Sequence, residues 1–288
     1  MRSKALPFVV VVTLLWGSSW PLFPVAVREV SVWTFRSVSM IASAIALLLM
    51  ARVRGEPLRI PREHWGTIVA ASLSYIVVWN TASTFAAVLI PSGQAAILGY
   101  TMPIWTALIA WLVLGQRPTA RVLLALVIGA AGVLLLVWNG VDAYARAPLG
   151  FALGLLAGIG WACGTLVLKA RPVPTTPLVL TAWQVLVAAV PMTIAALAFG
   201  SYQWFVPSMA TVASIAYITF VPMAIGNAAW FSIVRMLPAN VAALSSVLVP
   251  VIAMIAGAIV HQEPLGMIQW ISMACCSAGV VLALQPKR

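Results

Sequence analysis

The chain has 288 residues, of which 63% are hydrophobic and only 7% are charged, and its mean hydropathy is +1.08. Soluble domains carry roughly a quarter of charged residues, so this composition excludes a soluble globular protein and indicates an integral membrane protein. The formal net charge of +11 does not indicate nucleic-acid binding, because the basic residues are scattered over short connections and do not gather on one face.

Ten apolar stretches are long enough to cross a bilayer, since about 20 residues span the hydrocarbon as a helix. In chain order they cover residues 5–27, 31–51, 65–89, 91–114, 119–138, 147–168, 176–199, 208–233, 238–260 and 265–285. Their hydrophobic runs are continuous and do not alternate with polar residues, which argues against a transmembrane barrel. We therefore predict an all-α membrane protein with ten transmembrane spans.

Part of the first half of the chain returns in the second half, 147 positions later. The run Pro91-Ser92-Gly93-Gln94-Ala95-Ala96 becomes Pro238-Ala239-Asn240-Val241-Ala242-Ala243. At the same offset Asn80 falls on Asn227 and Pro103 falls on Pro250. Each copy contains an odd number of spans, so the second copy enters the membrane from the opposite side. This predicts two inverted-topology five-span repeats, residues 1–140 and 147–288, around a central cavity, an arrangement typical of secondary transporters.

The basic residues predict the orientation. If the N-terminus is cytoplasmic, the inner segments hold Arg2, Lys4, Arg52, Arg54, Arg59, Arg62, Arg117, Arg121, Lys169, Arg171, Arg235, Lys287 and Arg288. The outer segments hold only Arg28, Arg36 and Arg146. This bias follows the positive-inside rule, and ten spans return the C-terminus to the same side. We therefore expect a multi-pass protein of the bacterial cytoplasmic (inner) membrane with both termini in the cytoplasm.

Two prolines, Pro103 and Pro250, lie near the middle of the fourth and ninth spans. A proline removes a backbone donor and pushes against the carbonyl four residues earlier, here Gly99 and Ser246. Their equivalence in the two repeats favours a pair of hinges beside a cavity over the alternative of ordinary membrane prolines repaired by their neighbours.

Few polar side chains occur inside the spans, and they define the candidate substrate-binding residues. Amides in hydrocarbon must face protein or water, and large aromatic rings suit a planar ligand. The candidates are Tyr75, Trp79, Asn80 and Ser83 in the third span, Tyr100 in the fourth, Trp161 in the sixth, Trp183 in the seventh, and Tyr217 and Asn227 in the eighth. The alternatives are hydrogen bonding between helices for the amides and core packing for the rings. Gly150, Gly154 and Gly158 form a small-residue stripe that predicts close helix approach.

Charged residues are placed at loops or span ends and none is expected at mid-span. A charge at the bilayer centre costs roughly 2.5–3.5 kcal/mol or more, and carriers of strongly charged solutes usually retain one as a partner. This placement favours a neutral or zwitterionic solute over sugar phosphates, nucleotides and polyamines. An enzyme is disfavoured because His64 and His261 lie at span ends and neither HExxH nor Gly-x-Ser-x-Gly occurs. We expect no catalytic residue, no metal and no cofactor.

Several of these segments together resemble the drug/metabolite transporter superfamily in its ten-helix EamA-type branch. They are Trp16-Gly17, the Pro91-to-Pro103 stretch, Leu114-Gly115-Gln116, and the Pro238-to-Pro250 stretch with Gln262-Glu263. Gln116 stands where the family commonly has Glu, and Ala162 replaces the Gly of the second Trp-Gly pair.

Within that branch, Tyr100 ahead of Pro103, the aromatic face of the third span and Trp161 are most similar to the bacterial aromatic amino-acid exporters of the YddG type. The resemblance implies alternating-access export of neutral metabolites, aromatic and other apolar amino acids first, with a multidrug or amphiphile exporter as the alternative. It also implies that spans 1, 3, 4, 6, 8 and 9 surround the cavity while spans 5 and 10 pack to one side. The expected partners are a small-molecule substrate and the lipid bilayer, with no nucleic acid and a monomeric chain.

Overall fold

The structure is a computed structural model that describes residues 2–200, 206–262 and 266–284. The first five spans are α1 (Arg2–Ser19) continued by η1 (Trp20–Leu22) and α2 (Phe23–Ala26); α3 (Val32–Val53); α4 (Trp65–Ala71), η3 (Ser72–Val77) and α5 (Val78–Leu89); α6 (Ser92–Gly99) and α7 (Met102–Leu112); and α8 (Ala120–Asn139). A short turn, η2 (Arg62–His64), precedes α4.

The last five spans follow α9 (Val141–Arg146). They are α10 (Pro148–Ala170); α11 (Pro177–Phe199); α12 (Met209–Ile218), η4 (Thr219–Gly226) and α13 (Asn227–Met236); α14 (Ala239–Ser245), η5 (Ser246–Leu248) and α15 (Val249–His261); and α16 (Met267–Leu284).

The ten predicted spans are all present as helices, and their ends differ from the predicted ends by at most three residues. Nine runs of helix within the described ranges are long and apolar enough to cross a membrane, and α16 adds an eighteen-residue tenth. No strand occurs among the described residues. The prediction of an all-α membrane protein is confirmed.

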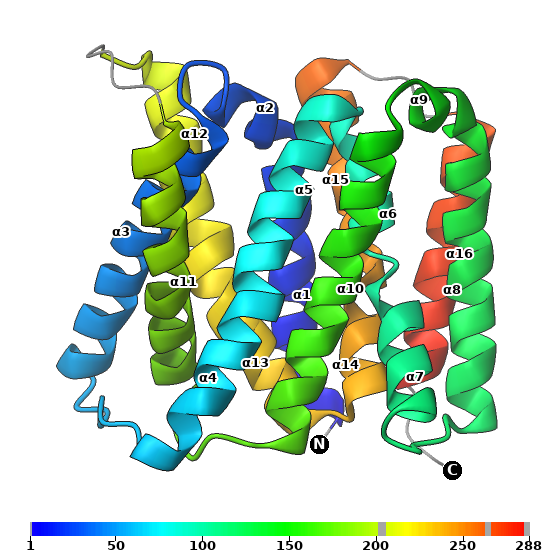
Figure 1. Ribbon diagram of the computed structural model, residues 1–288. Coiled ribbons are helices and arrows are strands. Elements are labelled where there is room, and N and C mark those ends of the chain that lie inside the picture. Colours follow the sequence, from blue (N-terminus) through cyan, green and yellow to red (C-terminus); the bar gives the residue numbers. More distant parts are fainter. Residues whose placement is uncertain (1, 201–205, 263–265, 285–288) are drawn as a thin grey trace.

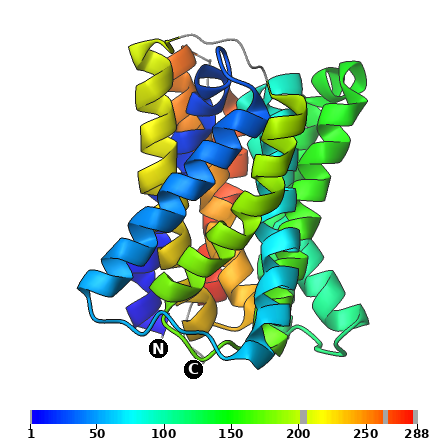
Figure 2. The ribbon, with the colours of Figure 1, turned by 60° about the vertical axis from the view of Figure 1, so that its left-hand side comes forward.

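The spans of the two halves pack against one another in matched pairs. Span 2 packs along span 7 (α3 on α11) and span 5 along span 10 (α8 on α16), on opposite sides of the bundle (Figure 1). Span 1 contacts spans 8 and 9, and span 6 makes the equivalent contacts with spans 3 and 4. In the turned view α3 crosses the front of the bundle obliquely beside α11 (Figure 2). Two halves related by a two-fold axis would make such exchanged contacts. Helix α1 begins at the same end of the bundle at which α16 ends (Figure 1).

Spans 3 and 8 each contain a π-helix, and the two are equivalent. Ser72 begins η3 and Thr219 begins η4, 147 positions apart. The Ser72 hydroxyl donates to the Ile68 carbonyl at 2.7 Å, and the Thr219 hydroxyl donates to the Ile215 carbonyl at 2.6 Å. A π-turn holds more residues than an α-turn and occurs frequently at functional sites. The π-helix η4 ends directly before Asn227, and η3 ends three residues before Asn80, the two asparagines that the repeat singles out.

Spans 4 and 9, predicted as single helices, are interrupted in the middle. Tyr100 and Thr101 separate α6 from α7, and the 3-10 turn η5 separates α14 from α15. Pro103 and Pro250 lie in the first turn of α7 and of α15, where the missing N–H removes no helical hydrogen bond. The prolines therefore start new helices and do not kink continuous ones.

Helix α10 is the most closely packed helix of the centre because glycines line two of its sides. An ideal Cβ on Gly158 would lie 2.8 Å from the Gly99 carbonyl, and one on Gly154 would lie 2.7 Å from the Leu98 side chain. On the side facing span 3, a Cβ on Gly164 would lie 2.3 Å from the Tyr75 Cβ. The predicted close approach along this stripe is confirmed: α10 packs against span 4 at Gly154 and Gly158, and against span 3 at Gly164.

Candidate functional site

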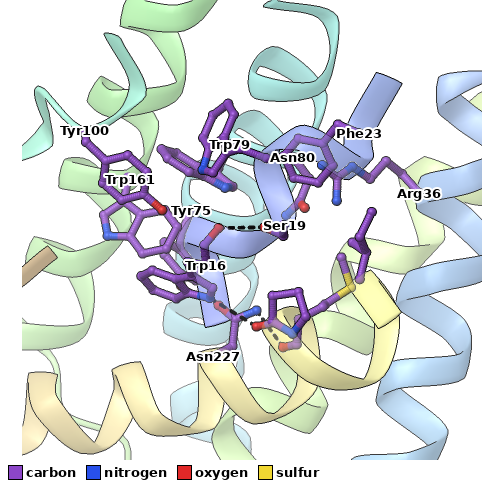
Figure 3. A pocket seen from close by; sticks show the side chains of 14 residues that line it. Trp16, Ser19, Phe23, Arg36, Tyr75, Trp79, Asn80, Tyr100, Trp161 and Asn227 are labelled. Atoms are coloured by element: carbon purple, nitrogen blue, oxygen red, sulfur yellow. Dashed lines mark hydrogen bonds between the residues drawn. The ribbon is translucent and has the colours of Figure 1, made fainter. Parts of the chain in front are cut away.

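A small cavity lies at the centre of the bundle, between spans 1, 2, 3, 4, 6 and 8 (Figure 3). Its volume is about 40 Å³, which is room for a few water molecules and less than any amino acid occupies. The residues that line it are Trp16, Ser19, Trp20, Phe23, Arg36, Tyr75, Trp79, Asn80, Tyr100, Trp161, Ile218, Pro222, Met223 and Asn227. In this structure the cavity is therefore too small to hold an amino acid.

The resemblance placed span 9 at the cavity and did not include span 2. In the structure span 9 packs behind span 1, where a Cβ on Gly17 would lie 2.4 Å from the Ile252 Cβ. Arg36 of span 2 lines the cavity in addition. Spans 5 and 10 pack to one side, as expected (Figure 1).

Trp161 is the centre of the aromatic wall. Its ring contacts four others, with centroid distances of 4.2 Å to Tyr75, 4.5 Å to Trp79, 4.9 Å to Trp16 and 5.3 Å to Trp230. The first three contacts are edge-to-face, an arrangement favoured by the ring quadrupoles. The indole is 2% exposed, and its Nε1 has no hydrogen-bond partner among the residues that the structure describes. Trp161 therefore couples spans 1, 3 and 8 through one side chain.

The two equivalent asparagines make the same local hydrogen bond. The Asn80 amide donates to the Ile76 carbonyl at 2.8 Å, and the Asn227 amide donates to the Met223 carbonyl at 2.7 Å. Each side chain thereby satisfies a carbonyl of the preceding π-helix. The Tyr75 hydroxyl donates to Asn227 Oδ1 at 2.7 Å and so joins span 3 to span 8 across the two halves.

Trp16 fixes span 1 against the same π-helix of span 8. Its Nε1 donates to the Pro222 carbonyl at 3.0 Å, and Gly226 leaves the space that the indole fills, since a Cβ there would lie 2.6 Å from Trp16 Nε1. The Ser19 hydroxyl donates to the Trp16 carbonyl at 2.7 Å. These contacts place both residues on the cavity wall.

The prediction that no charged residue lines the cavity is wrong, because Arg36 lies in its wall. It belongs to the first turns of α3, but its side chain is only 1% exposed and points into the cavity (Figure 3). Its Nε donates to the Thr84 hydroxyl at 2.7 Å, and its guanidinium carbon lies 4.7 Å from the ring centroids of both Phe23 and Phe35. Residue counting placed Arg36 in an outer segment, whereas the packing of spans 1 and 3 over α3 buries it.

The structure brings six of the nine candidate binding residues together around the cavity: Tyr75, Trp79, Asn80, Tyr100, Trp161 and Asn227. The other three lie outside it. Trp183 packs on Trp65 and donates its Nε1 to the Leu58 carbonyl at 2.8 Å. Tyr217 is half-buried, and its hydroxyl forms a hydrogen bond with the Ser18 hydroxyl at 2.7 Å. Ser83 is fully buried among helices, and its hydroxyl has no hydrogen-bond partner among the described residues.

Trp16, Trp20 and Arg36 also line the cavity, although they were not among the nine candidate binding residues. Trp16 and Trp20 are one helical turn apart, and Trp16 aligns with Trp161 at an offset of 145 positions, so the repeat itself carried a signal for the first of them. For Arg36 two features could have indicated burial. It lies about one helical turn inside the predicted span, and that span contains no acidic residue to pair with it.

Comparisons with known proteins agree with this architecture. A solved structure superposes on the chain with a TM-score of 0.79, covers 98% of each chain and shares 17% sequence identity, which is a likeness of fold alone. The "uncharacterized transporter YvbV" of Bacillus subtilis is 24% identical and covers 88% of this chain and 82% of its own. The "probable amino-acid metabolite efflux pump" of Escherichia coli is 24% identical over 98% and 95%. The "uncharacterized inner membrane transporter YedA" of Escherichia coli is 26% identical over 93% and 87%.

A description of one protein family matches the chain twice, over residues 3–138 and 148–285, which together include all ten spans. The chain is therefore a multi-pass membrane transporter and not an enzyme, and it belongs to the EamA-like transporter family.

Proposed function

We propose that this chain exports small zwitterionic metabolites, aromatic and other apolar amino acids first, across the bacterial cytoplasmic membrane by alternating access. The observation that carries this proposal is the small cavity between the two halves, whose wall combines seven aromatic rings with two amides and a guanidinium. Rings provide apolar area for an amino-acid side chain, and the polar groups suit its backbone charges. The efflux pump of Escherichia coli, similar over nearly its whole length, adds support by its name.

The inverted repeat and the small size of the cavity together support alternating access. We take residues 1–140 and 147–288 as the two repeats, with Pro103 and Pro250 beside the interruptions where the halves bend. A cavity of about 40 Å³ cannot admit an amino acid, so a transported solute requires the walls to separate.

A second cavity, of about 330 Å³, supports passage from the end of the bundle where α1 begins. Lys169, Phe231 and Arg235 are among the residues that line it. The Phe231 ring lies 5.4 Å from the Tyr75 ring, so these two rings separate it from the central cavity. Because the positive-inside bias assigns this end to the cytoplasm, we propose that both termini are cytoplasmic and that the wider cavity is the entrance for export.

A multidrug exporter is the alternative, since tryptophan walls suit planar drugs as well. Arg36 argues against cationic drugs. At an effective dielectric constant of about 20, a like charge about 6 Å away would be repelled by roughly 3 kcal/mol. Among the residues that line the cavity there is no acidic side chain to offset this repulsion.

The test is transport by the purified chain in proteoliposomes. Vesicles loaded with unlabelled phenylalanine should take up labelled phenylalanine by exchange, saturably, and labelled threonine should compete. Empty vesicles and vesicles containing Trp161→Ala serve as controls. Removing the ring that contacts four others should reduce exchange at least tenfold.

The absence of saturable exchange with any amino acid, together with exchange of a planar cation, would replace this proposal by the drug-export alternative. A Trp161→Ala variant with the wild-type rate would show that the cavity is not the binding site.

A further inference from the structure

We infer that Arg36 is the carboxylate-binding residue of the central cavity, so that the transported solutes are those with a free carboxylate. This inference rests on the proposed function, which it deepens by naming the chemical group that the site selects. It depends on a buried cation with unused donors, a cavity in contact with it, and an aromatic wall on the opposite side.

The guanidinium has no counter-ion in the part of the chain that the structure describes. The only hydrogen bond that it makes there is from Nε to the Thr84 hydroxyl, and Nη2 is buried without a partner. The nearest acidic residue in sequence, Glu29, is engaged elsewhere and accepts a hydrogen bond from the Ser208 backbone amide at 2.7 Å. A buried cation without a paired anion is costly, so a site of this kind is completed by an anionic ligand.

The surroundings of Arg36 hold its charge in place without neutralising it. Phe23 and Phe35 each present a ring at 4.7 Å, and cation–π contacts of this kind fix a guanidinium while its N–H donors stay free. The Thr84 hydroxyl accepts the hydrogen bond from Arg36 Nε–H and donates one to the Asn80 backbone carbonyl at 2.6 Å. The guanidinium can therefore offer Nη2 to a planar carboxylate, with which Arg makes short, charge-assisted hydrogen bonds.

The cavity is polar at one side and aromatic at the other. Arg36 reaches in from the side opposite Tyr100 and Trp161, and Asn80 and Ser19 lie between them (Figure 3). A solute with its carboxylate on Arg36 would direct its side chain toward the rings once the walls separate. Asn80 Oδ1, to which no described residue donates, is placed to accept from an ammonium group. This polarity matches an α-amino acid.

The experiment measures ligand binding and does not require flux. The purified wild-type chain in detergent is titrated by isothermal calorimetry with phenylalanine and with phenylalaninamide, which differ only in the carboxyl group. We expect phenylalanine to bind roughly 10- to 100-fold more tightly than the amide, as charge-assisted hydrogen bonds imply. In Arg36→Gln this ratio should fall close to one, and the amide, relieved of repulsion, should bind more tightly than it does to the wild type.

Two further variants separate charge from structure. Arg28→Gln removes an exposed arginine of the loop before α3 and should keep the wild-type ratio. Arg36→Lys keeps the charge but loses the planar donor fork, so it should retain part of the ratio.

Equal binding of acid and amide by the wild type overturns the inference even if Arg36→Gln does not fold, and so does an unchanged ratio in Arg36→Gln. Selective acid binding without any flux in proteoliposomes would instead contradict the proposed export function while leaving the carboxylate site intact.

Discussion

The hydrogen bond from Tyr75 to Asn227 is a direct polar link between the two halves at the cavity, and the effect of its removal can be predicted quantitatively. Tyr75 is 1% exposed and the O–O distance is 2.7 Å. In Tyr75→Phe the Asn227 Oδ1 loses its donor, which costs about 1–3 kcal/mol for a fully buried acceptor. Asn227 is 9% exposed and borders the cavity, so water can replace part of the bond. We expect a loss of roughly 1–2 kcal/mol, or about 5- to 30-fold in the folded-to-unfolded ratio.

The assay is reversible unfolding in mixed detergent micelles, followed by tryptophan fluorescence, in a double-mutant cycle with Asn227→Ala. The single Asn227→Ala change also removes the bond to the Met223 carbonyl, but that loss cancels in the cycle. The coupling energy between the two positions should therefore equal about 1–2 kcal/mol.

Tyr217→Phe is the matched control, because Tyr217 also donates or accepts a 2.7 Å bond but is half-buried and has no contact with Asn227. Tyr217→Phe combined with Asn227→Ala should be additive within about 0.5 kcal/mol. Additivity of Tyr75→Phe with Asn227→Ala would refute the view that this bond holds the halves together.

Three other changes test the packing, the interruptions and the loop between spans 1 and 2. Gly164→Ala forces a methyl group against Tyr75 of the facing helix and should lower the free energy of unfolding by about 1–3 kcal/mol. Gly66→Ala is the control: an added Cβ there would meet no atom within 4 Å, so this change should be neutral or stabilising. Equal effects of the two changes on the unfolding midpoint would contradict this reasoning. Pro103→Ala allows α6 and α7 to join into one helix and should slow exchange severalfold, as should Pro250→Ala; wild-type exchange rates would show that the interruptions do not bend. Glu29 accepts a hydrogen bond from the Ser208 backbone amide, which lowers the pKa of its carboxyl below the ordinary 4.5. The bond therefore stabilises the fold above pH 4.5, and this stabilisation is lost as the pH falls through the lower pKa of the folded state. Glu29→Gln should reduce the loss of unfolding free energy at acid pH, and an unchanged loss would exclude the contribution.

The fold was predictable because the length of the apolar stretches decides how many helices cross the bilayer. A bilayer demands about 20 apolar residues per helix, and the ten stretches satisfy this with ends that agree to within three residues. The interruptions were not predicted, since a proline in the first turn of a new helix and one that kinks an existing helix look the same in sequence. The structure distinguishes them, because α7 begins at Met102 and α15 begins at Val249, so that each proline lies in a first turn.

The candidate site was predictable in part, and the misses have a common cause. A span that is apolar on all sides does not reveal which face is turned inward, so Trp183 and Tyr217 were grouped with Trp161 although they point elsewhere. Arg36 was judged by its distance from the end of the span. Its burial depends on Phe23 of span 1 and Thr84 of span 3, which contact it in three dimensions and which no count along α3 includes.

The wide turns η3 and η4 give spans 3 and 8 a capacity that ordinary helices lack. One residue more or fewer in such a turn rotates the part of the helix beyond it by about 100° and translates it by about 1.5 Å relative to the part before it. Rewinding η3 would carry Trp79 and Asn80 around the helix axis together, and rewinding η4 would do the same to Asn227. The wall of the cavity can thus be exchanged by a screw motion within single helices, without any tilt of the bundle.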